Sequence, residues 1–213
     1  MKNQLNYYSG IALITGSVLS IIAMTLHPSG GSFEYLLKIS NVIITSHSIA
    51  MLSIPAILLG FWGLTKRLAT AEILATGGFI TMCIGMFAVT CAAAINGLAM
   101  PFFVNQYRDA TAEKINLLKP VMRYSWALNH AFDYVFIGAA CVAVLLWSVA
   151  IIKTKVFPKW IGYLGIATAI SAVAAIIAGF VFVDLTGFRV FIAGFVLWVV
   201  VTGVFLKRPE AVI

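Results

Sequence analysis

Charged residues are scarce in this chain, and this scarcity excludes whole classes of protein. Only 10% of the 213 residues are Asp, Glu, Lys or Arg, whereas 62% are hydrophobic. A water-soluble domain of this length could not cover so much apolar surface with so few polar side chains. The net charge of +7 does not indicate nucleic-acid binding, because the basic residues lie in short clusters between apolar runs. That pattern is typical of membrane proteins that obey the positive-inside rule.

Several familiar catalytic and redox motifs are also missing. The sequence contains no HExxH, GxSxG, Walker or dinucleotide-binding glycine motif, so the common metalloprotease, hydrolase and nucleotide-driven classes lack support. The cysteines Cys83, Cys91 and Cys141 lie inside apolar runs without a CxxC spacing. We interpret them as packing residues.

Apolar runs are the dominant feature that is present. Each is long enough to span a bilayer, which takes about 20 residues. The first run is longer than a usual signal-peptide core and lacks a clear cleavage site, so it is predicted to be a membrane helix. The sequence therefore predicts an all-α integral membrane protein, a single domain over residues 1–213 with six transmembrane helices. The runs cover residues 8–27, 41–64, 71–100, 125–152, 160–183 and 187–206.

The segment 101–123 is the longest stretch between two apolar runs. Asp109 can cap a short helix that continues to about Leu118, and Pro120 would follow its end. We expect a short amphipathic outer helix between the third and fourth transmembrane helices, lying over the bundle.

The distribution of Lys and Arg predicts the orientation. Short segments beside helix ends on one side carry more basic residues than the other side, where most lie in one longer loop. We therefore expect a cell (cytoplasmic) membrane protein with cytoplasmic N- and C-termini. The basic residues assigned to the cytoplasmic side are Lys2, Lys66, Arg67, Lys153, Lys155, Lys159, Lys207 and Arg208; those on the other side are Lys38, Arg108, Lys114, Lys119, Arg123 and Arg189.

The histidines supply the main functional clue. In this topology His27, His47 and His130 all lie near the outer side, and Asp133 is one turn beyond His130 on the same helix face. An ionisable group at that depth costs about 2.5–3.5 kcal/mol, so Asp133 should face the bundle interior and pair with His130, His47 or Arg189. The sequence predicts that the three histidines and Asp133 converge on one outward-facing pocket.

Several chemistries fit such a pocket. Imidazoles and a carboxylate are ligands that zinc prefers, and the thioethers of Met24 and Met51 could share faces with histidines and favour copper. Alternatively, His47 and His130 could bind a haem as paired axial ligands. The pocket residues could also serve structure alone, through hydrogen bonds and helix pairing.

Two resemblances accompany this pattern. Six spans with three histidines and an aspartate resemble, in residue type only, the superfamily of alkaline ceramidases and progestin/adiponectin-type receptors, whose zinc is held by histidines near one membrane face. No histidine follows His130, so the late HxxxH of that superfamily is absent and its catalytic residues are not carried over. The segment 157–165 is similar to segments of small uncharacterised multi-span bacterial membrane proteins, which implies a bacterial membrane and no activity.

Three functions remain open at this stage. The first is a membrane-embedded binding protein or enzyme that holds a metal or haem in the pocket and acts on a small molecule or ion. The second is a small transporter or accessory subunit that uses the same residues as a proton or ion relay. The third is a structural partner without chemistry, in a homo-oligomer or beside another membrane protein.

Overall fold

The computed structural model describes the backbone of residues 2–208 and the side chains of residues 4–208, and this part of the chain is helical without a strand. Six helices are long and apolar enough to cross a membrane, as the sequence predicted. The elements are α1 (Lys2–Leu26), α2 (Phe33–Arg67), the 3-10 turn η1 (Ala69–Ala71), α3 (Glu72–Ala94), the π-helical segment η2 (Ile95–Ala99), α4 (Met100–Gln106), α5 (Ala112–Thr154), α6 (Lys159–Ile177) and α7 (Leu185–Leu206).

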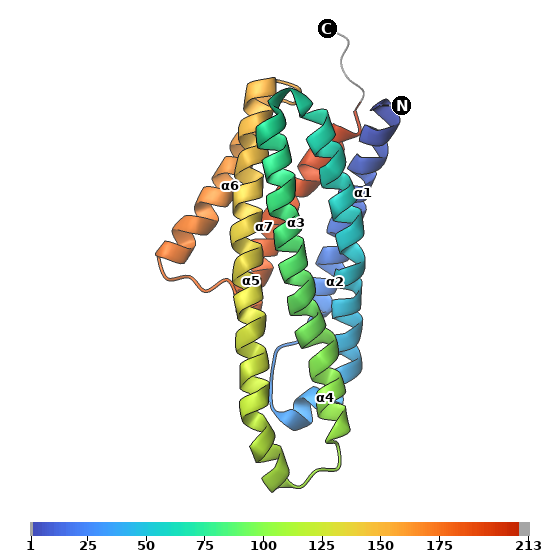
Figure 1. The fold of residues 1–213 in the computed structure, drawn as a ribbon, viewed down its shortest axis with the longest axis vertical. Coiled ribbons are helices and arrows are strands. Elements are labelled where there is room, and N and C mark those ends of the chain that lie inside the picture. Colours follow the sequence, from blue (N-terminus) through green and yellow to red (C-terminus); the bar gives the residue numbers. More distant parts are fainter. Residues whose placement is uncertain (1, 209–213) are drawn as a thin grey trace.

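One end of the bundle collects most of the short basic segments. The start of α1, the α2–α3 turn, the α5–α6 turn and the end of α7 all lie at this end (Figure 1). It therefore carries Lys66, Arg67, Lys207, Arg208 and the lysines of 153–159, and we call it the basic end. The predicted location of the C-terminus concerns residues 209–213, which lie outside the described residues.

The core is centred on Trp147 of α5. Its indole is fully buried and stacks on Phe61 of α2, with ring centroids 4.5 Å apart, and on Trp198 of α7, at 6.3 Å. The indole nitrogen donates to the carbonyl of Ala75 at 3.1 Å and lies 3.3 Å from the hydroxyl oxygen of Thr65. A buried tryptophan needs such an acceptor. This one side chain thus connects α2, α3, α5 and α7.

The predicted short outer helix is not a separate element. The N-cap is Thr111 rather than Asp109, because the Thr111 hydroxyl accepts from the Lys114 backbone nitrogen, and α5 then continues through Pro120. Proline removes one backbone donor, so the Asn116 carbonyl loses its helical partner. Asn116 is exposed, where solvent can satisfy that carbonyl. The amphipathic pattern seen in the sequence is the first part of the long helix α5.

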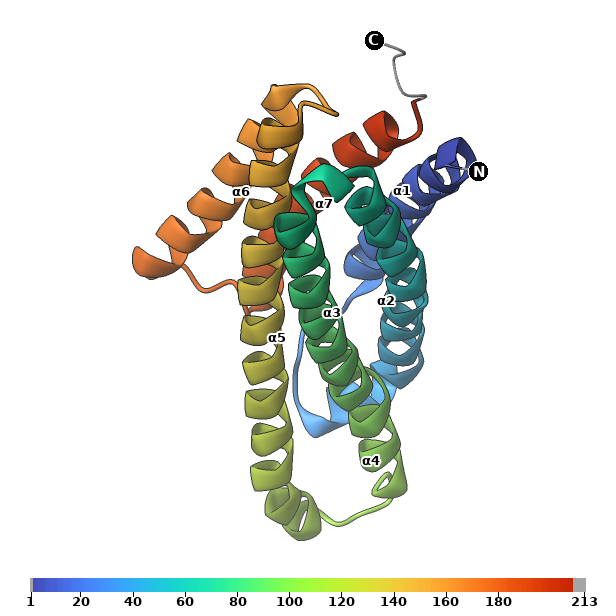
Figure 2. The ribbon, with the colours of Figure 1, turned by 45° about the horizontal axis from the view of Figure 1, so that its top comes forward.

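Two helices are much longer than a membrane crossing requires. The 43 residues of α5 extend about 64 Å at 1.5 Å per residue, whereas a hydrocarbon core is about 30 Å thick. The 35-residue α2 is also too long. Figure 2 shows the first half of α5 and the η2–α4 segment continuing away from the basic end. We call these parts, with the first third of α2, the outer extension.

Candidate functional site

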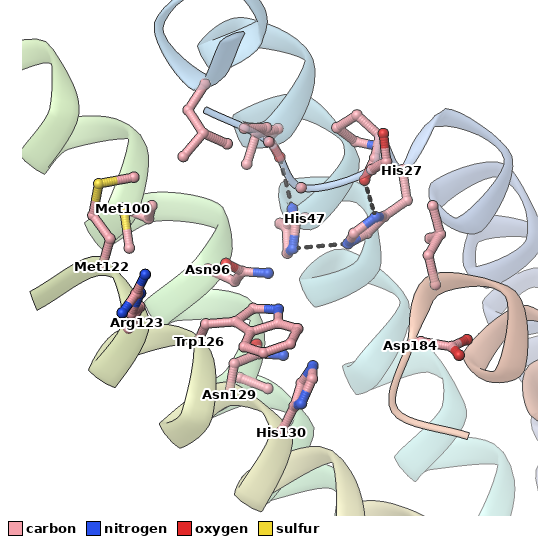
Figure 3. A pocket seen from close by; sticks show the side chains of 18 of the residues that line it. His27, His47, Asn96, Met100, Met122, Arg123, Trp126, Asn129, His130 and Asp184 are labelled. Atoms are coloured by element: carbon pink, nitrogen blue, oxygen red, sulfur yellow. Dashed lines mark hydrogen bonds between the residues drawn. The ribbon is translucent and has the colours of Figure 1, made fainter. Parts of the chain in front are cut away.

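A cavity of about 900 Å³ opens inside the outer extension, beneath the loop 27–32 that connects α1 to α2. This volume falls within the range of roughly 300–1,000 Å³ that small-molecule sites occupy. Its walls come from the end of α1, from α2, α3, η2, α4 and α5, and from the start of α7, and all four predicted site residues line it. Figure 3 shows the three histidines among the lining residues. Apolar lining residues include Met24, Leu36, Val89, Met100, Met122 and Phe188.

Two of the histidines meet directly on one wall of this cavity. The Nε2 atoms of His27 and His47 lie 3.2 Å apart, and the ring centroids are 4.6 Å apart at an interplanar angle of 52°. His27 follows the end of α1, whereas His47 lies in α2 and is only 6% exposed. The loop between α1 and α2 turns the chain back and brings the two rings together. We call them the histidine pair.

The other ring nitrogens determine the protonation of the histidine pair. Nδ1 of His27 lies 2.9 Å from the carbonyl oxygen of Pro28, and Nδ1 of His47 lies 2.8 Å from that of Ile43. A carbonyl oxygen only accepts hydrogen bonds, so each Nδ1 carries a proton and donates it. In the neutral rings both Nε2 atoms then present lone pairs, which repel each other. A proton or a metal cation between them removes that repulsion.

The surroundings of His27 favour its neutral form. Burial holds the pKa of His27 below its ordinary value, the hydrogen bond to Pro28 opposes this shift, and the charge of Arg189 adds to it. At neutral pH these surroundings favour the uncharged ring. The neutral imidazole is the form that binds metal ions.

The geometry of the histidine pair matches a shared tetrahedral ion. Two nitrogens that each lie 2.0–2.1 Å from zinc at the tetrahedral angle are about 3.3–3.4 Å apart, close to the 3.2 Å between the two Nε2 atoms. Metal-binding histidines also usually donate their other N–H to a carbonyl or carboxylate. Both rings of the pair already do so.

The remaining predicted ligands make other contacts. His130 packs against Trp126 with ring centroids 4.1 Å apart and the two ring planes tilted by 51°, and Asp133 accepts from Nδ2 of Asn129 at 2.7 Å. This asparagine was not among the three partners expected for Asp133. Within the described residues, no group of three or more His, Cys, Asp or Glu side chains is placed to hold a metal. Convergence of all four residues on one ion therefore stays a prediction.

Arg189 has a role that the sequence did not indicate. Its guanidinium donates to the carbonyl of Met24 at 3.2 Å and to that of His27 at 2.9 Å, so it binds the C-terminal end of α1. A cation is favourable there because the last helical carbonyls lack intrahelical donors. Arg189 thus holds the backbone of His27 in place from α7, a contact between residues far apart in the chain.

Gly97 provides the space for His47. It lies in the π-helical segment η2, and a Cβ atom at this position would overlap the Cβ and ring atoms of His47. Single π turns within α-helices often occur at functional sites. A glycine in an apolar helix looks ordinary in the sequence, so no local pattern could have shown that it faces a histidine from another helix.

The first half of α5 contributes a polar stripe that the sequence analysis also missed. Lys119, Arg123, Trp126 and His130 are three or four residues apart, so they share one helix face that lines the cavity. Their spacing was a readable signal. The expected helix end at Pro120 would separate Lys119 from the other three residues, so the shared face becomes visible only in the continuous helix α5.

Replacing Gly97 by alanine is expected to displace His47 and destabilise the fold by about 1–3 kcal/mol, as overpacking does. Unfolding in mixed detergent micelles, followed by circular dichroism, measures the change. Gly138→Ala on α5 is the matched control, because a Cβ there meets nothing within 4 Å. Equal stability of the two variants would show that Gly97 does not make room for His47.

Comparison of the chain with known protein families, curated proteins and solved structures gives no match.

Proposed function

We propose that this chain is a multi-pass membrane protein that binds a zinc or copper ion through the Nε2 atoms of His27 and His47. The observation that carries the proposal is the 3.2 Å distance between the two Nε2 atoms. In each ring the other nitrogen, Nδ1, already donates a hydrogen bond to a backbone carbonyl. Metal binding relieves the lone-pair repulsion and uses both rings in their neutral form.

The ion would have free coordination positions facing the cavity. Two protein ligands leave two positions of a tetrahedral ion for water, a substrate or further side chains. A metal with an open position can lower the pKa of bound water or polarise a carbonyl group. The site is therefore suited to a metal-dependent enzyme as well as to a binding protein, and the cavity supplies room for a small molecule beside the ion.

Elemental analysis of the purified protein, before and after equilibration with zinc or copper, tests the proposal. We expect one ion per chain, removable by a chelator. Failure to retain either metal after equilibration would rule out the proposed site. An absorption spectrum on the same sample tests the haem alternative through its Soret band.

The contact within the pair weighs against haem at His47. Axial ligands lie on opposite faces of a porphyrin, and the Nε2 of His27 already lies beside the Nε2 of His47. A ring placed between His47 and His130 would require His27 to move away. The same geometry does not hinder a small ion.

A proton relay is the second candidate, because 3.2 Å is also a hydrogen-bond distance. In that case one imidazole is doubly protonated and donates to the other. The metal-free protein in vesicles would then carry protons in a manner that depends on both histidines. A metal site predicts no such transport, so proton flux without metal separates the two functions.

The basic end is proposed to face the cytoplasm, so the cavity opens on the outer side of a cell membrane. Short segments at that end carry an excess of Lys and Arg, as cytoplasmic segments of membrane proteins do. Single cysteines at Thr70, in the α2–α3 turn, and Asn116, in the outer extension, test it in a background without native cysteines; both native side chains are exposed. An impermeant thiol reagent applied to intact cells should label the cysteine at position 116 and spare that at position 70. The reverse pattern would invert the topology.

A further inference from the structure

Arg123 lies at the edge of the cavity and has no partner among the described residues. It is exposed and lines the cavity, and within the described residues its side chain forms no hydrogen bond, ion pair or ring contact. Lys119, one turn earlier on α5, interacts electrostatically with Glu34. Arg123 therefore presents a guanidinium that is available to a ligand.

The acidic residues that line the same cavity do not compete for Arg123. Asp184 caps α7 by accepting from the Gly187 backbone nitrogen at 2.6 Å, and Asp133 accepts from Asn129. A planar guanidinium binds carboxylate and phosphate groups through paired hydrogen bonds. The wall around Arg123 is therefore suited to an anionic group.

Apolar side chains continue from this cation into the cavity. Met122 precedes Arg123 on α5, Met100 lies on the facing wall from α4, and the indole of Trp126 lies between Arg123 and His130 (Figure 3). Asn96 on η2 lines the cavity as well and makes no side-chain hydrogen bond among the described residues. The cavity thus combines polar groups at Arg123 and Asn96 with an apolar lining, which favours a ligand that has a polar group and an apolar part.

The level of the cavity makes it accessible to membrane-soluble molecules. A crossing of about 20 residues that starts from the basic end at Arg67 or Lys153 reaches the levels of His47 and Asp133. Both residues line the cavity. In the proposed topology the inner part of the cavity lies at the outer boundary of the hydrocarbon, and Arg123, ten residues before Asp133 on α5, lies about 15 Å farther out, past a headgroup layer of roughly 5–8 Å.

We propose that the cavity binds an anionic amphiphile. Its carboxylate or phosphate is held by Arg123, with Asn96 as a further donor, and its apolar part lies along Trp126, Met100 and Met122. This inference rests on the proposed function, because it names the class of molecule that would lie beside the metal ion. The binding groups for the amphiphile are nevertheless distinct from His27 and His47.

Quenching of tryptophan fluorescence by dibromostearate tests the inference on metal-free, chelator-treated protein in phosphatidylcholine nanodiscs. Bromine quenches an indole at short range, so Trp126 reports occupancy. Dibromostearate dissolved in the bilayer also quenches the exposed Trp62 and Trp160, so only the saturable component of the quenching reports the cavity, and we expect that component to be lost in Trp126→Phe. The alcohol with the same dibrominated chain should bind about 10- to 100-fold more weakly, because it lacks the charge-assisted bond to Arg123.

Two variants of equal charge provide the decisive comparison. Arg123→Gln should remove the preference for the carboxylate over the alcohol. Lys114→Gln removes the same charge from the same part of α5 but its side chain lies over the Tyr107 ring and does not line the cavity, so this variant should keep the preference. Equal binding of acid and alcohol in the unmodified protein, or equal behaviour of the two variants, would overturn the inference.

Further arms identify the source of the anion and separate this inference from the metal site. Nanodiscs that contain dibrominated phosphatidylglycerol test whether a lipid headgroup supplies the anion. Quenching in these nanodiscs that depends on Arg123 assigns the anion to a membrane lipid. Quenching by dibromostearate alone assigns it to a fatty acid. Zinc retention is measured on a second portion of the same preparation after it has been equilibrated with zinc. Binding of the amphiphile without retention of zinc would refute only the proposed metal site, and zinc retention without preference for the anion would refute only this inference.

Discussion

Glutamine in place of His27 or His47 is expected to lower zinc or copper affinity by more than about 100-fold. The reason is that each change removes one of the two nitrogens that face the shared position. Loss of a side chain that merely supports a ligand already costs about 10- to 100-fold in affinity. Glutamine roughly preserves size and polarity, so folding should be less affected than by alanine. Competition with a chromophoric chelator on purified protein measures the affinity.

His130→Gln is the matched control for this experiment. His130 lines the same cavity but its ring packs against Trp126 rather than joining the histidine pair. We expect the zinc or copper affinity of His130→Gln to lie within a fewfold of that of the unmodified protein. Loss of metal in this variant as well would restore the four-residue site predicted from the sequence, whereas retention in His47→Gln would contradict the proposed ligation.

Trp147→Ala is expected to have the largest effect on stability, about 3–5 kcal/mol, in the range typical of buried tryptophan. The change leaves a cavity between Phe61 and Trp198 and leaves the Ala75 carbonyl without its indole donor. In the proposed membrane setting these losses would weigh heavily, because packing and interhelical hydrogen bonds, rather than exclusion of water, hold membrane helices together. Unfolding by SDS in mixed micelles, followed by circular dichroism, measures the effect.

Trp160→Ala offers a control with the same chemical change at the surface. Trp160 is 48% exposed on α6, and its main aromatic contact is edge-to-face with Phe205 at 5.6 Å. Such a pair contributes about 0.5–1.5 kcal/mol. If both variants lost the same stability, the stack around Trp147 would not be the centre of the core.

The sequence predicted the helices well because hydrophobicity is a local property. In lipid, the backbone N–H and C=O groups of a long apolar run must be satisfied by hydrogen bonds within the helix. The six runs accordingly correspond to six helices of the described chain. The error in the segment 101–123 was also local. Pro120 was expected to end a helix, but it lies inside α5. The one hydrogen bond lost there is in the exposed outer extension and does not break the helix.

The level of the site could also be read from the sequence. Counting residues from the basic clusters placed His27, His47, His130 and Asp133 near one end of the bundle, and the structure finds all four lining one cavity. Depth along a helix follows from chain length alone, at about 1.5 Å per residue. Chain length does not determine how each helix is rotated about its axis or which helices lie next to it.

Only the tertiary structure decided which of these residues touch. Sequence reasoning favoured His47 and His130 because their depths matched, whereas the structure joins His47 to His27. That contact depends on the turn of the loop after α1, on the hold of Arg189 on the His27 carbonyl, and on the space left by Gly97. Each of these contacts joins separate elements, and contacts of that kind depend on how helices pack, which no run of neighbouring residues encodes.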